Sequence, residues 1–314
     1  MKRNIKNNKS YLIIIFLVIS VFFTNSCSAA ETANNFSSQT VLVGSTPGDS
    51  LIKSLLSIYS DQQIDFIRWE LILNQAENDS KTYVLNIAFG ESQPNTNGFK
   101  DGGEKLSFKG VYTVSKIQQR ELYQLKSEKT PNIISLVKLN ENLFHLLSPD
   151  NKLLVGNGGW SYTLNRKDAS ANSYAALPWL TVSLPVETAR EVIFEGRTPC
   201  LDFAEQYNIK VGNDCIKLKW RLTLFRDSET NQPTTYVLKG TINRPIETKG
   251  KWTIIKPIEN NSEAVIYQLD PDKPAESMYF WVGDENLLFF LDKEKRLFTG
   301  NSDFSFTLNR TKMK

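Results

Sequence analysis

Hydrophobic and polar residues alternate along several short stretches of this chain. The clearest runs from Ile216 to Leu224, where every second residue is apolar and those between are Lys, Arg or Thr. The alternation recurs from Ile67 to Leu73, again with a Trp at an apolar position. A period of two places the apolar side chains on one face, whereas a helix would scatter them around its circumference. Both stretches are therefore predicted to be half-buried antiparallel strands.

The second half of the chain repeats the first. Residues Glu141–Arg166 and Glu285–Arg310 align without a gap, with identical residues at 12 of 26 positions. Shorter apolar stretches recur in the same order: Thr82–Leu85 with Thr235–Leu238, Gly110–Val114 with Gly250–Ile254, Tyr123–Leu125 with Tyr267–Leu269, and Leu143–Leu147 with Leu287–Leu291. The chain is interpreted as one β unit used twice.

The predicted fold class is all-β, with two tandem antiparallel β-barrels or strongly curved sheets. Each copy holds about seven or eight short strands bounded by turn residues, which suits an up-and-down barrel. Pairing of the last strand with the first would remove exposed edges. Leucine and isoleucine at helical spacing within Asp49–Ser60 predict a short helix in the first copy. The corresponding stretch Leu201–Asp214 is less regular, and no helix is predicted there.

The N-terminus, residues 1–30, is predicted to be a signal peptide. Four basic residues precede an apolar run, Tyr11–Phe23, that is too short to span a membrane comfortably. Thr24-Asn25-Ser26-Cys27 resembles a bacterial lipobox, although Thr24 replaces the usual Leu. On that interpretation Cys27 is lipidated and anchors the protein to the membrane, since two or more acyl chains give stable anchoring. The alternative is cleavage after Ala30 and simple secretion.

Composition sets the remaining boundaries. Residues 31–38 form a polar tether, 39–166 the first β domain, 167–186 a linker and 187–314 the second β domain. The length of 314 residues and a hydrophobic content of 40% allow two domains with separate cores.

Removing residues 1–26 takes away four basic residues and leaves 33 Lys and Arg against 34 Asp and Glu. Without a basic surplus, nucleic-acid binding is not expected.

Two cysteines remain after Cys27, namely Cys200 and Cys215. The first copy has Gly48 and Ile64 at these positions, so both cysteines are absent together, as expected for a pair. Exported proteins retain disulfides, and a bridge across about 15 residues would add about 3 kcal/mol of stability. A disulfide is predicted; two unlinked buried thiols, or a metal or redox role, are the alternatives.

The second copy resembles a known family. Gly-Arg-Thr-Pro-Cys ending at Cys200, the alternating strand, a Gly-Lys-Trp-Thr strand at 250–253 and Leu-Leu-x-x-Leu-Asp at 287–292 are similar to the N-terminal domain of the copper resistance lipoprotein NlpE. The resemblance implies a small lipocalin-like β-barrel in an outer-membrane lipoprotein linked to envelope stress and copper. The family pattern Pro-Cys-x-x-Cys places its second cysteine at Phe203, so copper handling is not carried over.

Candidate chemistry is sparse. The one histidine, His145, aligns with Phe289 and is interpreted as structural, and soft Cu(I) sites need thiolate or thioether clusters that are not visible. No Ser/His/Asp or Cys/His set can be assembled, so no catalytic residue, metal or cofactor is predicted. Arg166 and Arg310 are expected to end the last strand of each copy, paired or snorkelling at the rim; a ligand-binding role is the alternative.

These observations predict a non-enzymatic cell-envelope lipoprotein, anchored in the outer membrane through Cys27, with a stress or interaction role and an envelope protein as partner. Periplasmic or secreted location is the alternative. A lipocalin-like carrier of a small apolar ligand is the alternative function, since barrels of this size can hold one. Trp69 and Trp220 favour filled interiors, whereas a continuous apolar cavity of about 300 Å³ would favour the carrier.

Overall fold

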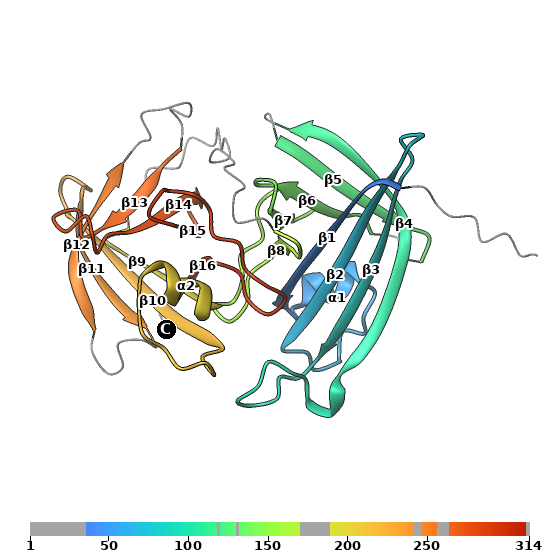
Figure 1. The fold of residues 1–314 in the computed structure, drawn as a ribbon, viewed down its shortest axis with the longest axis horizontal. Helices are drawn as coiled ribbons and strands as arrows, with labels where there is room; N and C mark the ends of the chain where they lie inside the picture. Colours follow the sequence, from blue (N-terminus) through green and yellow to red (C-terminus); the bar gives the residue numbers. More distant parts are fainter. Residues whose placement is uncertain are drawn as a thin grey trace, which may run out of the picture. The chain divides into compact units, whose positions relative to one another are not determined.

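The strands of the computed structural model close into two eight-stranded antiparallel barrels (Figure 1). The structure describes residues 36–117, 120–129, 132–169, 189–240, 247–255 and 264–311. The first barrel contains β1 (Phe36–Pro47), β2 (Phe66–Ala76), β3 (Lys81–Gly90), β4 (Glu104–Ile117), β5 (Arg120–Ser127), β6 (Ile134–Lys138), β7 (Leu143–Leu147) and β8 (Thr163–Arg166). It also carries the helix α1 (Ser50–Leu55) and the 3₁₀ turn η1 (Lys100–Gly102).

The second barrel repeats this strand order. It contains β9 (Glu191–Pro199), β10 (Lys217–Arg226), β11 (Pro233–Gly240), β12 (Thr248–Ile255), β13 (Ile266–Leu269), β14 (Met278–Asp284), β15 (Leu287–Leu291) and β16 (Thr307–Thr311), with the helix α2 (Leu201–Gln206) after β9. In each barrel the last strand pairs with the first, β8 with β1 and β16 with β9. The all-β prediction of two tandem barrels is confirmed.

The alternation of apolar and polar residues along a strand separates the inner from the outer face of the barrel. In β10, Leu218, Trp220, Leu222 and Leu224 are all buried. Ile216 was wrongly predicted to join them: it lies before the strand and is 45% exposed. The reason is that pairing with β9 begins at Lys217, opposite Pro199, so Ile216 belongs to the loop.

The two barrel interiors are filled at equivalent positions. The indole Nε1 of Trp69 donates to Thr46 Oγ1 at 2.9 Å, and that of Trp220 donates to Thr198 Oγ1 at 2.8 Å. Trp69 is 1% exposed and Trp220 is 7% exposed. Each bulky ring thus occupies its barrel interior while its one polar atom stays hydrogen-bonded, as burial requires.

A helix follows the first strand in both copies. The predicted helix in the first copy is confirmed: the carboxylate of Asp49 caps α1 by accepting from Ile52 N at 3.0 Å. The second copy was expected to lack one, and that was wrong. In α2, Phe203 is buried and stacks on Tyr207, with ring centroids 4.4 Å apart. Residues four apart share one helix face. Phe203 also meets the ring of Trp220 edge-on at 5.0 Å, and this contact anchors α2 to the barrel interior.

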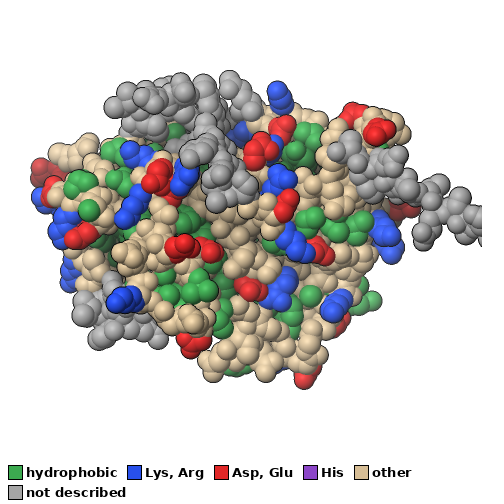
Figure 2. Space-filling model, in the orientation of Figure 1, with side chains coloured by type: hydrophobic (Ala, Val, Ile, Leu, Met, Phe, Trp, Pro, Cys, Tyr) green, Lys and Arg blue, Asp and Glu red, His purple; other side chains and the backbone are tan. Residues whose placement is uncertain are grey.

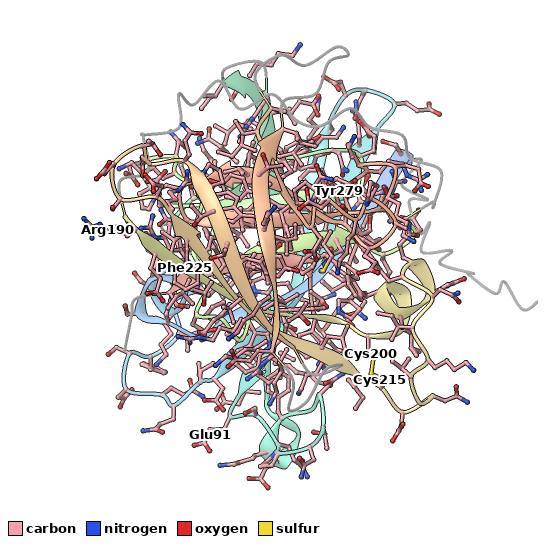
Figure 3. All side chains as sticks on the ribbon, turned by 90° about the vertical axis from the view of Figure 1, so that its left-hand side faces the viewer. Glu91, Arg190, Cys200, Cys215, Phe225 and Tyr279 are labelled. Carbon is pink, nitrogen blue, oxygen red and sulfur yellow. A yellow bond between two sulfur atoms is a disulfide. The ribbon has the colours of Figure 1, made fainter. Side chains whose placement is uncertain are left out.

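A disulfide joins Cys200 to Cys215 at a Cα–Cα distance of 5.7 Å (Figure 3). It ties the start of α2 to the loop that enters β10. The equivalent residues of the first barrel also touch. A Cβ placed on Gly48 would lie 2.3 Å from Ile64 Cγ2, so the isoleucine fills the space that a side chain at position 48 would need.

Candidate functional site at the contact between the barrels

The closing segments of the two barrels face each other. Ser161 Oγ lies 2.6 Å from Ser305 Oγ, and Thr163 Oγ1 lies 2.9 Å from Thr307 Oγ1. Each residue pairs with its own repeat equivalent, 144 positions later. A patch that meets a copy of itself in this way is an isologous contact, the arrangement found in symmetric dimers.

Two asparagines make this contact reciprocal. The backbone N–H of Gly300 donates to Asn165 Oδ1 at 2.7 Å, and that of Gly156 donates to Asn309 Oδ1 at 2.7 Å. Asn165 is 0% exposed and Asn309 is 1% exposed. Sequence reasoning placed these residues at the strand ends without this cross-barrel role. The neighbouring Arg166 is ion-paired with Asp168 at 2.9 Å, as expected for a rim arginine.

Beneath these polar pairs lies a third hydrophobic core, formed by both barrels. Its buried members are Leu122, Val137, Leu139, Leu143, Leu147, Ala264, Ile266, Trp281, Leu287, Phe289 and Leu291. Five of these eleven residues lie on the outward faces of β7 and β15, whose inward residues belong to the two barrel interiors, and the other six lie on or beside β5, β6, β13 and β14. The barrels therefore keep separate cores and share an additional one.

His145 sits in this shared region and is satisfied there. Its ring nitrogens lie 3.0 Å from Thr163 Oγ1 and 2.9 Å from Leu154 O, and its ring meets that of Phe289 edge-on at 5.9 Å. Complete burial lowers the pKa of His145 to about 4. A neutral, hydrogen-bonded imidazole with no exposure is a structural residue, which agrees with its sequence interpretation.

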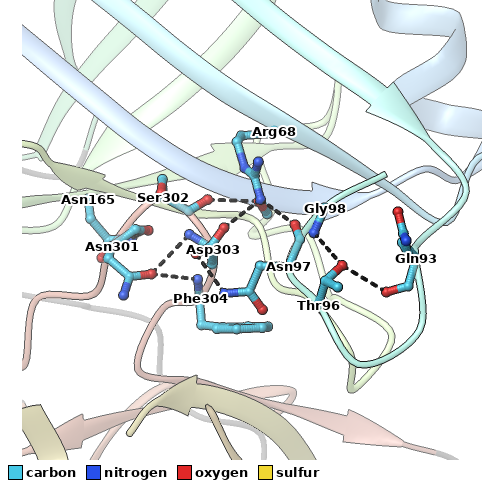
Figure 4. A network of polar contacts seen from close by, with 11 residues as sticks. Arg68, Gln93, Thr96, Asn97, Gly98, Asn165, Asn301, Ser302, Asp303 and Phe304 are labelled. Carbon is cyan, nitrogen blue, oxygen red and sulfur yellow. Dashed lines mark hydrogen bonds and ion pairs between the residues drawn. The ribbon is translucent and has the colours of Figure 1, made fainter. Parts of the chain in front are cut away.

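A polar network also links the barrels (Figure 4). Arg68 of β2 forms an ion pair with Asp303 at 2.5 Å and donates to Asn97 O at 2.6 Å. Asn97 donates in turn to the Asp303 carboxylate at 2.9 Å, and Ser45 Oγ donates to Ser302 O at 2.8 Å. The segment that precedes β16 is thereby held against β1, β2 and the loop after β3.

Residues from both barrels also line an open groove of about 610 Å³. Its apolar wall includes Leu122, Val137 and Leu153, and its charged groups include Arg120 and Asp284. Burial lowers the pKa of Arg120 to about 10 and raises the pKa of Asp284 to about 6. The groove combines an apolar surface with two cations, Arg120 and Lys152, and two acids, Asp284 and Glu285, which suits binding of a partially apolar surface.

A cavity of about 380 Å³ opens in the second barrel. Apolar side chains such as Trp220, Leu238 and Met278 share its wall with Asp270 and Lys293. Its volume passes the threshold of about 300 Å³ that would favour a carrier. The wall is not continuously apolar, because Asp270 accepts a hydrogen bond there from Tyr236 Oη at 2.5 Å.

The residues singled out by the sequence are distributed as follows. Cys27 lies outside the described residues, as do the rest of the predicted signal peptide and most of the predicted linker. Cys200 and Cys215 are bonded to each other. Within the part of the chain that the structure describes, no three His, Cys, Asp or Glu side chains gather as a metal site would require. The helices described there are all too short or too polar to cross a membrane.

Comparison with known proteins agrees with the sequence resemblance over part of the chain. The family model of the NlpE N-terminal domain matches residues 212–301, which run from the loop before β10 to the segment before β16. No curated protein and no solved structure matches the chain. The second barrel is thus similar to the NlpE N-terminal domain, and the first barrel shares its strand order.

Proposed function

We propose that this protein is a non-enzymatic lipoprotein of the cell envelope, built from two NlpE-like barrels, that acts through non-covalent contacts. The observation that carries the proposal is the NlpE match within the second barrel. The repeated strand order extends the NlpE-like assignment to the first barrel. The lipobox-like sequence Thr24-Asn25-Ser26-Cys27 supports anchoring at the outer membrane through Cys27, and the similarity to NlpE supports a role in envelope stress.

The anchoring is tested by mass spectrometry of the mature N-terminus, with Cys27→Ser as the variant and Ser28→Ala as its neighbour control. The expected wild-type product begins at Cys27 and carries the mass of a diacylglyceryl group and an acyl chain. It fractionates with the outer membrane, whereas Cys27→Ser does not, because attachment requires the thiol. An unmodified start at Glu31 would show that the protein is secreted without an anchor.

If the protein acts through non-covalent contacts, the groove between the barrels is the proposed binding site for an envelope protein partner. Val155 lines the groove and is 37% exposed, whereas Tyr59 is 82% exposed and does not line it. A photo-crosslinking residue at position 155 is expected to give a discrete adduct in intact cells, and one at position 59 is expected to give none. Equal adducts from both positions would mean that the groove has no preferred partner.

The carrier of a small apolar ligand is a second candidate, favoured by the cavity in the second barrel. Ala275 is exposed and lines this cavity, so Ala275→Trp would fill it without disturbing the barrel core. A carrier should bind a fluorescent fatty acid with saturation in the wild type and at least about tenfold more weakly in Ala275→Trp, because the indole takes the ligand's volume. Equal, non-saturating fluorescence in both proteins would exclude the carrier role.

A further inference from the structure

A smaller cavity, of about 160 Å³, lies beside the Arg68–Asp303 network. The first barrel contributes Arg68, Trp160 and the loop that follows β3, and the second contributes Arg197, Lys217 and the Asp303–Phe304 segment. Figure 4 shows Arg68, Asp303 and this loop converging at one place. The cavity belongs neither to the groove nor to the interior of the second barrel, with which it shares no lining residue.

Three cations line this cavity, and each lies over an aromatic ring. The distances from cationic group to ring centroid are 5.5 Å for Arg68 over Phe99, 4.9 Å for Arg197 over Trp160 and 5.5 Å for Lys217 over Phe304. The rings support one another, since Phe66 stacks on Trp160 at 4.9 Å and on Phe99 at 4.1 Å. Stacking on aromatic faces holds cations in place without neutralising their charge.

The charges in this cavity do not balance. Arg68 is paired with Asp303, but Arg197 and Lys217 have no ion pair or side-chain hydrogen bond with any residue that the structure describes. The nearby carboxylate of Asp65 accepts hydrogen bonds from Ser92 N and Oγ, at 2.8 and 2.7 Å. Three cations thus face one lining carboxylate, and the Asp65 charge, which also acts on Arg197, offsets only part of the remaining positive charge.

Burial makes this surplus costly. It lowers the pKa of Arg197, and it lowers the pKa of Lys217 with a further contribution from the neighbouring Arg197 charge. Both side chains are partly withdrawn from water, and an incoming negative charge would replace the hydration that they lose.

Two polar atoms of the cavity walls also lack a hydrogen-bond partner among the described residues. Arg68 Nε and Asn97 Oδ1 are buried, and neither has a hydrogen-bond partner among the described residues. The first is a donor and the second an acceptor. A bound group that offers both an oxygen anion and a hydroxyl would satisfy the two together.

We propose that this cavity binds a phosphate group, with Arg197 and Lys217 as its charge partners. A phosphate monoester carries about −1.5 to −2 charges at pH 7 and three acceptor oxygens, which suits a cavity with surplus positive charge. The guanidinium fork of Arg197 suits paired phosphate oxygens, and the ammonium of Lys217 acts as a point charge. The volume suits one such group, since sites for drug-sized ligands run from about 300 to 1,000 Å³. The phosphate comes either from a soluble phosphomonoester or from a lipid with a phosphomonoester headgroup.

The test is isothermal titration calorimetry of the purified full-length protein with inorganic phosphate at constant ionic strength. Arg197→Gln and Lys217→Gln are expected to weaken binding by about tenfold or more each, because each removes a charged hydrogen-bond donor. Lys219→Gln is the matched control. Lys219 lies two residues further along the same strand on the same face and does not line the cavity, so its loss should weaken binding far less than the loss of Lys217. Circular dichroism verifies that each variant is folded. If Arg197→Gln does not fold, the binding measured for Lys217→Gln decides the test.

Three further arms identify the source of the phosphate and the selectivity of the site. Saturable binding of glycerol 3-phosphate indicates a soluble phosphomonoester. Sedimentation with vesicles of phosphatidic acid, beyond that with phosphatidylglycerol vesicles and lost in Lys217→Gln, indicates a lipid headgroup. Sulfate should bind more weakly than phosphate, since it offers no hydroxyl to Asn97 Oδ1. The proposal fails if phosphate binds no better than chloride, or if wild type and both variants bind it equally. It does not depend on lipidation, so an unmodified N-terminus would leave it standing.

Discussion

At the scale of single residues, the two repeat asparagines differ in how completely they are satisfied. Asn165 accepts from Gly300 N and donates to Asn301 O at 3.1 Å, whereas Asn309 Nδ2 has no partner in the described part of the chain. We expect Asn165→Ala to lower the free energy of unfolding by about 1–3 kcal/mol, because it removes two part-buried hydrogen bonds, one from the Gly300 N–H and one to the Asn301 carbonyl. Urea denaturation measures the loss.

The matched variant is Asn309→Ala. This variant also removes the hydrogen-bond acceptor of the Gly156 N–H, but the side-chain amide that it removes already has an unsatisfied Nδ2. It should therefore lower the free energy of unfolding by less than Asn165→Ala does. Equal losses for the two variants would show that the hydrogen bonds of Asn165 Nδ2 contribute nothing to stability.

His145 predicts a dependence of stability on pH. Its pKa in the folded protein is about 4, below the usual value of 6.5. Since the fold holds the ring neutral, its contribution is fully present above about pH 6.5 and is lost as the pH falls towards 4. The loss over this window should reach about 3 kcal/mol. His145→Gln keeps a neutral hydrogen-bonding side chain, so it should flatten the pH profile measured by urea denaturation between pH 7 and 4.5. An unchanged profile would contradict the assignment.

At the scale of elements, the disulfide and its counterpart in the first barrel predict two separate losses. Cys200→Ala with Cys215→Ala releases the link between α2 and β10, and the free energy of unfolding should fall by about 3 kcal/mol. Gly48→Ala should destabilise the first barrel, because its Cβ would lie 2.6 Å from the Ile64 carbonyl oxygen as well as close to its side chain. Thermal denaturation checks both. A double-cysteine variant as stable as wild type would mean that the loop needs no covalent tie.

The strands were predictable because period-two alternation records one buried face, as along Leu218–Leu224. The runs Leu143–Leu147 and Leu287–Leu291 break that alternation, and every residue in both is buried. A strand without alternation is covered on both faces. This signal was present in the sequence and could have revealed the shared core. Helix α2 was missed because its apolar face is short and is followed by Gly212-Asn213.

The candidate sites were harder to foresee. Arg197, Lys217 and Arg68 lie on three different strands and meet at the cavity. The rings that Arg197 and Lys217 contact, Trp160 and Phe304, lie on other segments. No spacing along the chain records that convergence. On the face shown in Figure 2, Lys, Arg, Asp and Glu are interspersed, so that face shows no patch of one charge. Asn165 repeated visibly as Asn309, yet repetition alone could not show that the two copies meet.

At the scale of the molecule, the shared core should make the barrels unfold together. Leu287 and Trp281 are 0% exposed and belong to this core rather than to the second barrel's interior. Wild type is therefore expected to show one urea transition, with tryptophan fluorescence and far-ultraviolet circular dichroism coinciding.

Leu287→Asp would place an unpaired carboxylate between the barrels at a cost of about 3–5 kcal/mol, while leaving each interior packed. The barrels should then separate energetically, and the single transition should split into two. Val111→Asp is the control, since Val111 lies on the outer side of β4 and is 54% exposed. It should leave one transition at the wild-type midpoint. If Leu287→Asp also kept a single transition at that midpoint, the third core would contribute nothing to holding the two barrels together. The isologous contact would then add no stability.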